Sequence, residues 1–349
     1  MPKIQVNPAF PLFVDDARER VRLGDFPPTG QILDPAPPPL RRLLRLCAET
    51  PVERDALPAL VPEVPPAELD AAVERLLAAR ILVTDADLDV LTADARLSRL
   101  ALFLSMFHPA PEAASALAGL AGRHVAVLGA GAIGGAVALH LATSGVGALT
   151  LLDDDRVEPA NLHRQHLYTG RDVGTPKIEA AARTLREHCP GLEVTTVERR
   201  ITGPADVVTA ADLVVNTVDT PQPHIRRWVN LACVEAGTPF VTGGFNQHTG
   251  LVGPLVVPGK TGCLACQERA LAARYGSREL PSSDNPGRTI PSFGPLCGIV
   301  SGMLASEVIR YLTGPGAPAV EGRSVWLDLL TFTTTGWEFE RLPDCEVCG

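Results

Sequence analysis

Lysine is nearly absent from this sequence of 349 residues. Its 31 basic residues include only Lys3, Lys177 and Lys260, which leaves 31 − 3 = 28 arginines. Because arginine fills almost every cationic role, each remaining lysine is a candidate for a position that needs a compact point charge rather than a planar fork. The 40 acidic residues outnumber the basic ones, and the net charge is −9. This balance excludes a general nucleic-acid binder, which would carry a basic patch.

The sequence also lacks a targeting segment and a long uninterrupted apolar helix. Residues 1–13 contain prolines and no long apolar run, so no leader is predicted. Residues 125–152 have no Asp, Glu, Lys or Arg, but they carry six glycines and divide at Gly129 and Gly145. We expect a strand, a turn, a helix and a second strand there rather than a membrane span. The prediction is a soluble, cytoplasmic protein with no membrane partner.

Residues 1–92 are predicted to form a small separate domain. Short apolar runs such as Ile4-Gln5-Val6 indicate strands, and the apolar spacing at 40–46 and 67–79 indicates helices. Short strands with two or three helices fit a winged-helix-like module. The module has 10 basic and 15 acidic residues, a net charge of −5, which disfavours DNA. We therefore predict that it recognises a peptide by adding a strand at an exposed edge.

The remainder of the chain is predicted to have an α/β fold. Residues 93–122 are expected to form a helical connector, and from residue 123 to 349 strands and helices alternate. This alternation predicts a mainly parallel sheet wrapped by helices. Strands are expected at 125–128, 149–153, 194–198, 213–216 and 240–242, and helices at 133–144, 176–188, 224–236 and 296–312. A polar loop is predicted at 275–292.

A glycine-rich turn follows the first of these strands. It contains Gly129, Gly131, Ala132 and Gly134 and opens a helix, which is where backbone amides and the helix dipole favour a phosphate. Asp153 ends the next strand and is placed to bond ribose hydroxyls. This motif predicts a nucleotide without separating NAD from ATP, and a tight turn without a ligand is the structural alternative.

A second group of polar residues favours a triphosphate over a dinucleotide. It consists of Asp155, Asn161, Arg164, Gln165 and Lys177. Thr175 is predicted to be a helix N-cap and Pro176 the first helical residue, so that Lys177 lies in the first turn. Cations at this edge would neutralise charge on a transferred phosphoryl group and on leaving pyrophosphate, which hydride transfer does not need. The alternative is a solvated Arg and Lys on a surface loop.

Asp219 lies just beyond the strand predicted at 213–216. The carboxyl ends of strands in open α/β sheets are where ligands bind, so Asp219 is a candidate for holding Mg²⁺ together with phosphate oxygens. The alternative is that Asp219 caps the following helix.

Two Cys-x-x-Cys pairs predict a metal site. Cys263 and Cys266 are matched by Cys345 and Cys348 at the end of the sequence. Four thiolates in a chain without a secretion signal indicate a structural Zn²⁺ site with no position left for water. Disulfides are the competing interpretation. The four isolated cysteines are expected to be buried and inert, namely Cys47, Cys189, Cys233 and Cys297.

Together and in this order, these motifs resemble the ThiF/MoeB family of ubiquitin-activating-type adenylating enzymes. The resemblance covers residues 95–349 and implies a Rossmann-like adenylation domain that uses ATP and Mg²⁺, with Arg164, Lys177 and Asp219 as catalytic residues. The segment 96–99 resembles an element whose second arginine enters the nucleotide site of a partner subunit. This implies a homodimer in which Arg99 acts in trans, although Leu97 and Leu100 replace the Tyr and Gln of that element.

Within this family the chain is most similar to the peptide-adenylating enzymes of the microcin C type, in its length, its N-terminal extension and residues 253–263. That similarity implies adenylation of the C-terminus of a ribosomally made precursor peptide held by the N-terminal module. One alternative is adenylation of a ubiquitin-like sulfur carrier, which commonly involves a cysteine in the loop at 275–292. That loop contains none, but Cys297 lies just beyond it. The other alternative is a non-catalytic protein that binds leader peptides.

Overall fold

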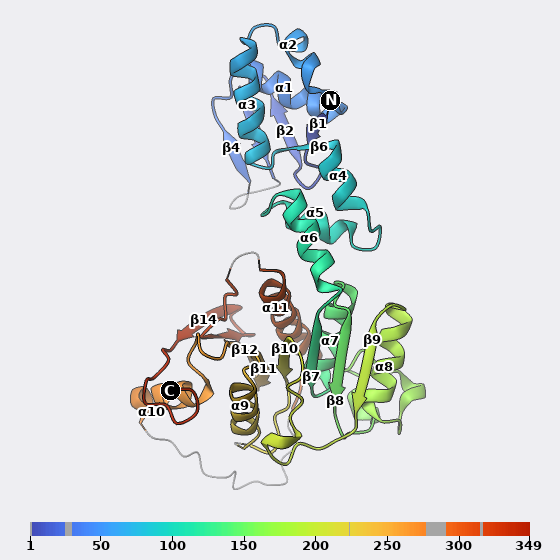
Figure 1. Cartoon of the computed structure of the whole chain (residues 1–349), viewed down its shortest axis with the longest axis vertical. Coiled ribbons are helices and arrows are strands. Elements are labelled where there is room, and N and C mark those ends of the chain that lie inside the picture. Colours follow the sequence, from blue (N-terminus) through green and yellow to red (C-terminus); the bar gives the residue numbers. More distant parts are fainter. Residues whose placement is uncertain (1, 25–29, 223, 277–290, 315–316) are drawn as a thin grey trace. The chain divides into compact units, whose positions relative to one another are not determined.

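The computed structural model describes residues 2–24, 30–222, 224–276, 291–314 and 317–349. Most of the loop predicted at 275–292 therefore lies outside the described residues. The chain divides into two compact units, Met1–Ala118 and Gly119–Gly349 (Figure 1). The boundary between them falls within the segment 93–122, where a connector was expected.

The first unit contains two small antiparallel sheets and several helices. One sheet has the strand order β5-β1-β6 and the other β2-β3-β4. Its strands are β1 (Lys3–Val6), β2 (Leu12–Asp15), β3 (Arg20–Leu23), β4 (Gln31–Leu33), β5 (Val52–Glu53) and β6 (Leu82–Thr84). Its helices are α1 (Pro38–Glu49), α2 (Leu57–Leu60), α3 (Pro66–Ala78), α4 (Asp85–Thr92) and α5 (Ser98–Ser105), with a 3₁₀ turn η1 (Arg54–Ala56).

Sequence patterning explains the core of this unit. Helix α1 presents Leu43, Leu44 and Cys47 to the same buried cluster as Ile4 of β1 and Val73 of α3. Apolar residues three and four positions apart place one stripe of each helix against the sheet. The helices predicted at 40–46 and 67–79 are present, and helix α6 (Ala110–Leu120), which follows α5, runs past the unit boundary at Ala118.

The second unit is built on one eight-stranded sheet in the order β14-β13-β12-β11-β10-β7-β8-β9. Its strands are β7 (His124–Leu128), β8 (Ala148–Leu152), β9 (Glu193–Val197), β10 (Leu213–Asn216), β11 (Phe240–Asn246), β12 (Thr249–Val256), β13 (Arg323–Asp328) and β14 (Thr333–Glu338). Strands β11, β10, β7, β8 and β9 are parallel, whereas β12, β13 and β14 are antiparallel. The predicted α/β fold with a mainly parallel sheet is confirmed.

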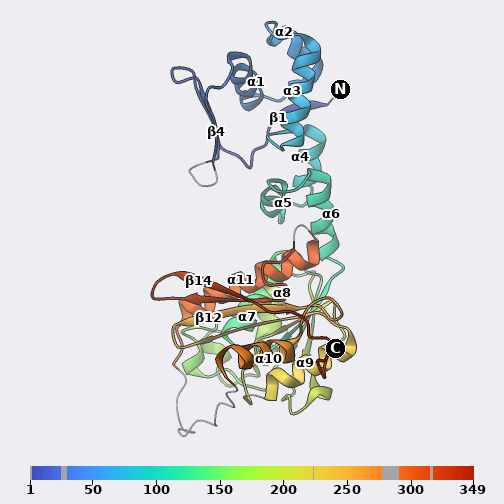
Figure 2. The same ribbon diagram turned by 90° about the vertical axis from the view of Figure 1, so that its left-hand side faces the viewer.

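Helices cover both faces of this sheet, with α9 and α10 on one face and α11 on the other (Figure 2). The helices are α7 (Ala132–Thr143), α8 (Lys177–His188), α9 (His224–Ala236), α10 (Leu264–Tyr275) and α11 (Gly294–Thr313), with 3₁₀ turns η2 (Pro159–Asn161), η3 (Gly170–Asp172) and η4 (Pro204–Asp206). Strands β7 and β10 are buried along nearly their whole length, as expected where helices cover both faces.

The segment 125–152 forms the predicted strand, turn, helix and strand, so it is not a membrane span. Among the described residues, α11 alone is long and apolar enough to cross a bilayer by length and composition. Half of that helix is buried within the protein. Its Val300 and Leu304 lie so close to β12 and β11 that a Cβ on Gly250 or Gly243 would approach them within 2.6 Å or 2.5 Å. Helix α11 therefore packs as a core helix.

Two details differ from the sequence predictions. The N-cap of α8 is Pro176, not Thr175, because Pro176 is extended and bridges to Arg156. The helix therefore begins one residue later than predicted, although Lys177 still lies in its first turn. The antiparallel strands β12 to β14 were not among the predicted strands. Strand β14 is mostly exposed and Thr-rich, so it lacks the apolar run by which the parallel strands were found.

Candidate nucleotide site and cysteine cluster

The glycine-rich turn joins β7 to α7 by a close approach of two backbone segments. Gly129 has a φ of +90°, a conformation that L side chains rarely adopt. A Cβ on Gly134 would lie 1.9 Å from the carbonyl oxygen of Gly129, so no larger residue fits without moving the turn. Helix α7 begins at Ala132 with Gly131 as its N-cap. Its first amides are thus free of intrahelical partners, as an anion site requires.

Asp153 fixes this turn from the adjacent strand end. Its Oδ2 accepts a hydrogen bond from the Ala130 N–H at 2.6 Å, and its Oδ1 accepts one from the Asp155 N–H at 2.8 Å. Burial raises the pKa of this carboxyl, while the charge of Lys177 and the two backbone N–H donors act in the opposite direction. Asp153, which the sequence predicts to bond ribose hydroxyls, therefore also supports the glycine-rich turn.

Lys177 is a buried cation at the same edge of the sheet. Its side chain is 7% exposed, and its Nζ lies 2.6 Å from Oδ2 of Asp155, which is 66% exposed. The Lys177 N–H also donates to the Asp155 carbonyl oxygen at 2.9 Å. Two contacts therefore hold the first turn of α8 against the segment that follows β8, and they place the ammonium group within the electrostatic reach of Asp153.

Asn161 and Arg164 lie on the segment between β8 and α8. Asn161 is buried and closes η2, where its Oδ1 accepts the Glu158 N–H at 3.0 Å. Arg164 is half-buried, and its Nη1 donates to the Ala160 carbonyl oxygen at 2.6 Å. Burial raises the pKa of the Cys297 thiol, and the Arg164 charge opposes that rise. Arg164 therefore lies near the start of α11.

Gln165 carries a polar atom that is buried without a partner. The residue is 4% exposed, and its Oε1 has no hydrogen-bond partner among the described residues. Its Nε2 lies 4.0 Å from the position that a Cβ on Gly131 would occupy, beside the N-terminus of α7. An unpaired buried amide oxygen is costly, so a polar ligand at the turn would satisfy it. The residues present therefore fit a nucleotide.

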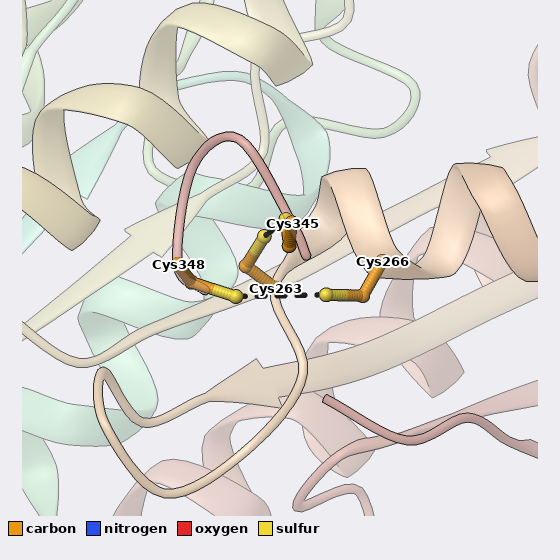
Figure 3. Close-up of side chains that lie close together, drawn as sticks. All are labelled: Cys263, Cys266, Cys345 and Cys348. Carbon is orange, nitrogen blue, oxygen red and sulfur yellow. Dashed lines mark hydrogen bonds between the residues drawn. The ribbon is translucent and has the colours of Figure 1, made fainter. Parts of the chain in front are cut away.

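The four paired cysteines converge on one point (Figure 3). The Sγ atoms of Cys263 and Cys345 lie 3.7 Å apart and those of Cys266 and Cys348 3.5 Å apart, and all four lie within 4.8 Å of one another. Tetrahedral zinc with Zn–S bonds of about 2.3 Å separates its sulfurs by about 3.8 Å. All four cysteines are buried and free of disulfides. The donor set and the spacing fit Zn²⁺.

Backbone and side-chain donors surround these thiols. Burial opposes ionisation of Cys345, but the N–H groups of Val347 and Cys348 lower the pKa of this thiol to about 7. Asn230 of α9 donates to Cys263 Sγ at 3.5 Å and accepts the Leu264 N–H at 2.9 Å. The cluster therefore joins the end of the chain to the first turn of α10 and to α9.

Comparison with protein families matches residues 109–347 to the ThiF family. This chain belongs to the ThiF family. Among its curated relatives is the sulfur carrier protein ThiS adenylyltransferase of Escherichia coli (strain K12), 32% identical over 209 residues, or 58% of this chain and 76% of that protein. The molybdopterin-synthase adenylyltransferase of the same organism is 32% identical over 203 residues, or 58% of this chain and 77% of that protein. The chain is a ThiF/MoeB-type adenylyltransferase, which disfavours the non-catalytic alternative.

Several solved structures match this ThiF-family chain over almost its whole length. Escherichia coli MccB with ATP is 25% identical, with a TM-score of 0.84 and coverage of 99% of this chain and 100% of that chain. A structure of E. coli MccB with MccA-N7isoASN is 24% identical, also with a TM-score of 0.84 and coverage of 99% and 100%. PaaA is 22% identical with a TM-score of 0.72, covering 96% of this chain and 99% of that chain.

Two of the predicted ThiF-type site residues, Asp219 and Arg99, make no contact with the other predicted site residues in the part of the chain that the structure describes. Asp219 is exposed and lies five residues before α9, so it does not cap that helix. Arg99 is exposed on α5, in the first unit, whereas the nucleotide turn lies in the second. The roles of Asp219 with Mg²⁺ and of Arg99 in a partner subunit stay predictions.

The sequence analysis missed two residues that fix the ThiF nucleotide turn. The hydroxyl of buried Tyr168 donates to the Ala130 carbonyl oxygen at 2.6 Å, and burial raises the pKa of that phenol. Thr217 Oγ1 donates to the Leu128 carbonyl oxygen at 2.9 Å. Tyr168 lies three residues after Gln165 and is one of only three tyrosines, which was the available signal. Thr217 follows β10 directly, but hydroxyl residues at strand ends are too common to single it out.

Proposed function

We propose that this chain adenylates the C-terminus of a ribosomally made peptide, which its N-terminal unit holds. The observation that carries the proposal is the extent of the N-terminal unit. The ThiF match begins at residue 109, and the two curated E. coli relatives align with 58% of the chain. MccB with ATP, in contrast, matches 99% of it. The region beyond the ThiF match thus has a counterpart in a protein whose structures include the peptide MccA.

The first unit offers an edge to which a peptide strand would add. Strand β4 is at the edge of the β2-β3-β4 sheet, and β3 is its only partner among the described strands. Its Ile32 is 53% exposed and its Leu33 45% exposed. Open backbone groups beside exposed apolar side chains are what peptide-binding edges use for affinity and specificity.

The second unit supplies charge and position for phosphoryl transfer. A carboxylate oxygen of the peptide attacks the α-phosphorus of ATP, and the bond to the bridging oxygen breaks to release pyrophosphate. The α7 N-terminus and Gln165 receive the nucleotide, while Lys177 and Arg164 neutralise charge on the phosphates. Asp219 would hold Mg²⁺, which supplies further charge neutralisation. Because positioning and charge suffice, no protein nucleophile is required.

The remaining parts of the proposal concern metal and assembly. Zn²⁺ held by Cys263, Cys266, Cys345 and Cys348 would be structural, since four sulfurs leave no open coordination position. The protein would act in the cytoplasm as a homodimer, with Arg99 of one copy reaching the nucleotide site of the other.

Exchange of ³²P-labelled pyrophosphate into ATP tests the function. We expect exchange only when a suitable peptide is added. Ile32→Asp should raise the KM for that peptide and leave the KM for ATP unchanged, because the change lies at the β4 edge. Ile81→Val, in the same unit and outside this edge, is the control. If no peptide supports exchange while a sulfur carrier does, the peptide proposal is wrong.

The second candidate is adenylation of a ubiquitin-like sulfur carrier. The names and 32% identity of the curated relatives favour it. The same exchange assay with a carrier that ends in Gly-Gly distinguishes the two, because the β4 substitution should not affect a substrate that does not use the N-terminal unit.

A further inference from the structure

Tyr168 is a buried phenol that binds the backbone of the glycine-rich turn. The residue is 5% exposed, and its hydroxyl donates to the Ala130 carbonyl oxygen at 2.6 Å. Ala130 itself is 1% exposed, so water has little access to this carbonyl. Burial and the negative charges of Asp153, Asp155 and Asp172 raise the pKa of the phenol, so the hydroxyl stays protonated and donates. The Ala130 carbonyl therefore depends on Tyr168 for its hydrogen bond.

The segment that carries Tyr168 is fixed against helices α7 and α8. The Tyr168 N–H donates to the Gln165 carbonyl oxygen at 3.3 Å. Leu167 is 3% exposed and packs on α7, where a Cβ on Gly135 would lie 3.3 Å from its Cδ1. From α8, Thr184 Oγ1 donates to the Leu167 carbonyl oxygen at 2.9 Å. The phenol hydroxyl thus has a defined position beside the turn.

The hydrogen bond from Tyr168 also fixes the direction of the next backbone amide. The cis peptide bonds among the described residues all precede proline, so the bond between Ala130 and Gly131 is trans. In a planar trans peptide the C=O and the following N–H point in opposite directions. Because Tyr168 holds the Ala130 carbonyl, the Gly131 N–H points away from the phenol. No group in the described part of the chain accepts a hydrogen bond from this N–H.

The two peptide planes on either side of Ala130 are held by different side chains. Asp153 accepts the Ala130 N–H at 2.6 Å and so holds the plane before it. The plane after it is held by Tyr168 through the carbonyl. Gly131 has no side chain that would resist a rotation of this second plane. Without the phenol hydroxyl, the plane could turn its carbonyl oxygen toward the side where its N–H now lies, and a carbonyl oxygen repels an anion.

We propose that Tyr168 is a positioning residue for adenylation, because its hydroxyl orients the Gly131 N–H toward a phosphate of ATP. Gly131 is the N-cap of α7, whose N-terminus favours an anion. An N–H bond to a charged phosphate oxygen is stronger than one to a neutral acceptor. The inference rests on the use of ATP by this adenylyltransferase, and it holds whether the adenylated substrate is a peptide or a sulfur carrier.

The test observes the Gly131 amide directly in the full-length protein by nuclear magnetic resonance. Labelling of alanine with ¹³C at the carbonyl and of glycine with ¹⁵N selects glycines that follow alanine. The sequence has four of them, Gly119, Gly122, Gly131 and Gly237. The Gly131 signal is the one lost in Ala130→Ser, which removes its labelled pair. We expect saturating ATP to move the Gly131 amide proton downfield, as a hydrogen bond to phosphate does. Tyr168→Phe should reduce this movement.

The affinity for ATP gives the second measurement. Tyr168→Phe should weaken ATP binding by about 10-fold in calorimetry, because the unbonded Ala130 carbonyl no longer fixes the amide. Tyr311→Phe, which removes a hydroxyl from a half-buried tyrosine of α11, is the matched control and should change neither measurement.

A purely structural role for Tyr168 would give a different pattern. Tyr168→Phe would then lower the free energy of unfolding in urea but leave the ATP affinity and the ATP-induced movement of the Gly131 signal unchanged. That result would overturn the proposal, and so would a Gly131 signal that does not move with ATP in the unsubstituted protein. Failure of the proposed function is distinguishable from both. If no peptide supports pyrophosphate exchange while the Gly131 signal moves with ATP, the peptide proposal is wrong and the role of Tyr168 stands.

Discussion

Replacing Lys177 with Met should separate catalysis from stability. The substitution keeps a long apolar stem in the buried position but removes the ammonium that lies 2.6 Å from Asp155. Asp155 is 66% exposed, so water can solvate its carboxylate once the lysine is gone. We therefore expect the free energy of unfolding to change by no more than about 1 kcal/mol. Loss of a cation that stabilises developing phosphoryl charge should slow exchange by about 10²- to 10³-fold, or about 3–4 kcal/mol.

The same substitution should also change the pH dependence of the residual activity. The charge of Lys177 holds down the pKa of Asp153, which burial raises. Without that charge the pKa of Asp153 rises further, and its carboxylate is protonated at a higher pH. Protonation of Asp153 weakens the hydrogen bonds that its carboxylate accepts from the Ala130 and Asp155 N–H groups. The acid limb of the exchange rate should therefore move to higher pH in Lys177→Met.

Lys260→Met is the matched control for this prediction. Lys260 lies 2.5 Å from Glu321 and its side chain is 65% exposed, in the turn before the cysteine cluster. The Lys260→Met substitution also removes one of only three lysines, but it removes no charge near the glycine-rich turn. For both variants we would measure pyrophosphate exchange at saturating ATP and the free energy of unfolding in urea. Equal loss of exchange in both variants, or full activity in Lys177→Met, would refute the assignment of Lys177.

Three further predictions follow from the described contacts. Gly134→Ala should lower the free energy of unfolding in urea by about 1–3 kcal/mol and weaken ATP binding in calorimetry, because the added Cβ would clash with the Gly129 carbonyl oxygen. The control is Gly298→Ala on α11, where the added Cβ meets nothing within 4 Å. This control substitution should raise the free energy of unfolding by about 0.5–1 kcal/mol. Cys345→Ser should reduce zinc from about one ion per chain to almost none by elemental analysis, whereas Cys189→Ser should retain it. Burial acts to raise the pKa of the Asp172 carboxyl, but the Thr169 N–H and the charge of Arg183 lower it below its ordinary value of 3.8. The ionised carboxylate therefore stabilises the fold at pH values above 3.8. The stability advantage over Asp172→Asn should be present at pH 7 and vanish as the pH falls below that value.

The sequence predicted the parts of the site that repeat a known local pattern. The glycine turn, the helix after it and the strand ending before Asp153 are local in sequence, and so are the Cys-x-x-Cys pairs. What local patterns could not reveal are contacts across the sheet. Tyr168 reaches the Ala130 carbonyl from 38 residues away and Thr217 reaches Leu128 from 89 away. The Thr175 error has a similar origin, because the extended bridge between Arg156 and Pro176 decides where α8 begins.

The geometry of the nucleotide turn and its charge are coupled through Asp153. The same carboxylate accepts the Ala130 N–H of the turn and the Asp155 N–H of the segment that pairs with Lys177. Any change that protonates Asp153 therefore loosens the turn and frees the segment that positions the lysine at the same time. Each backbone amide in such a site is a weak hydrogen-bond donor by itself. The position of the amides therefore depends on residues such as Asp153 that bond to more than one of them. This is why we expect losses at Asp153 and Lys177 to be less than additive when the two substitutions are combined.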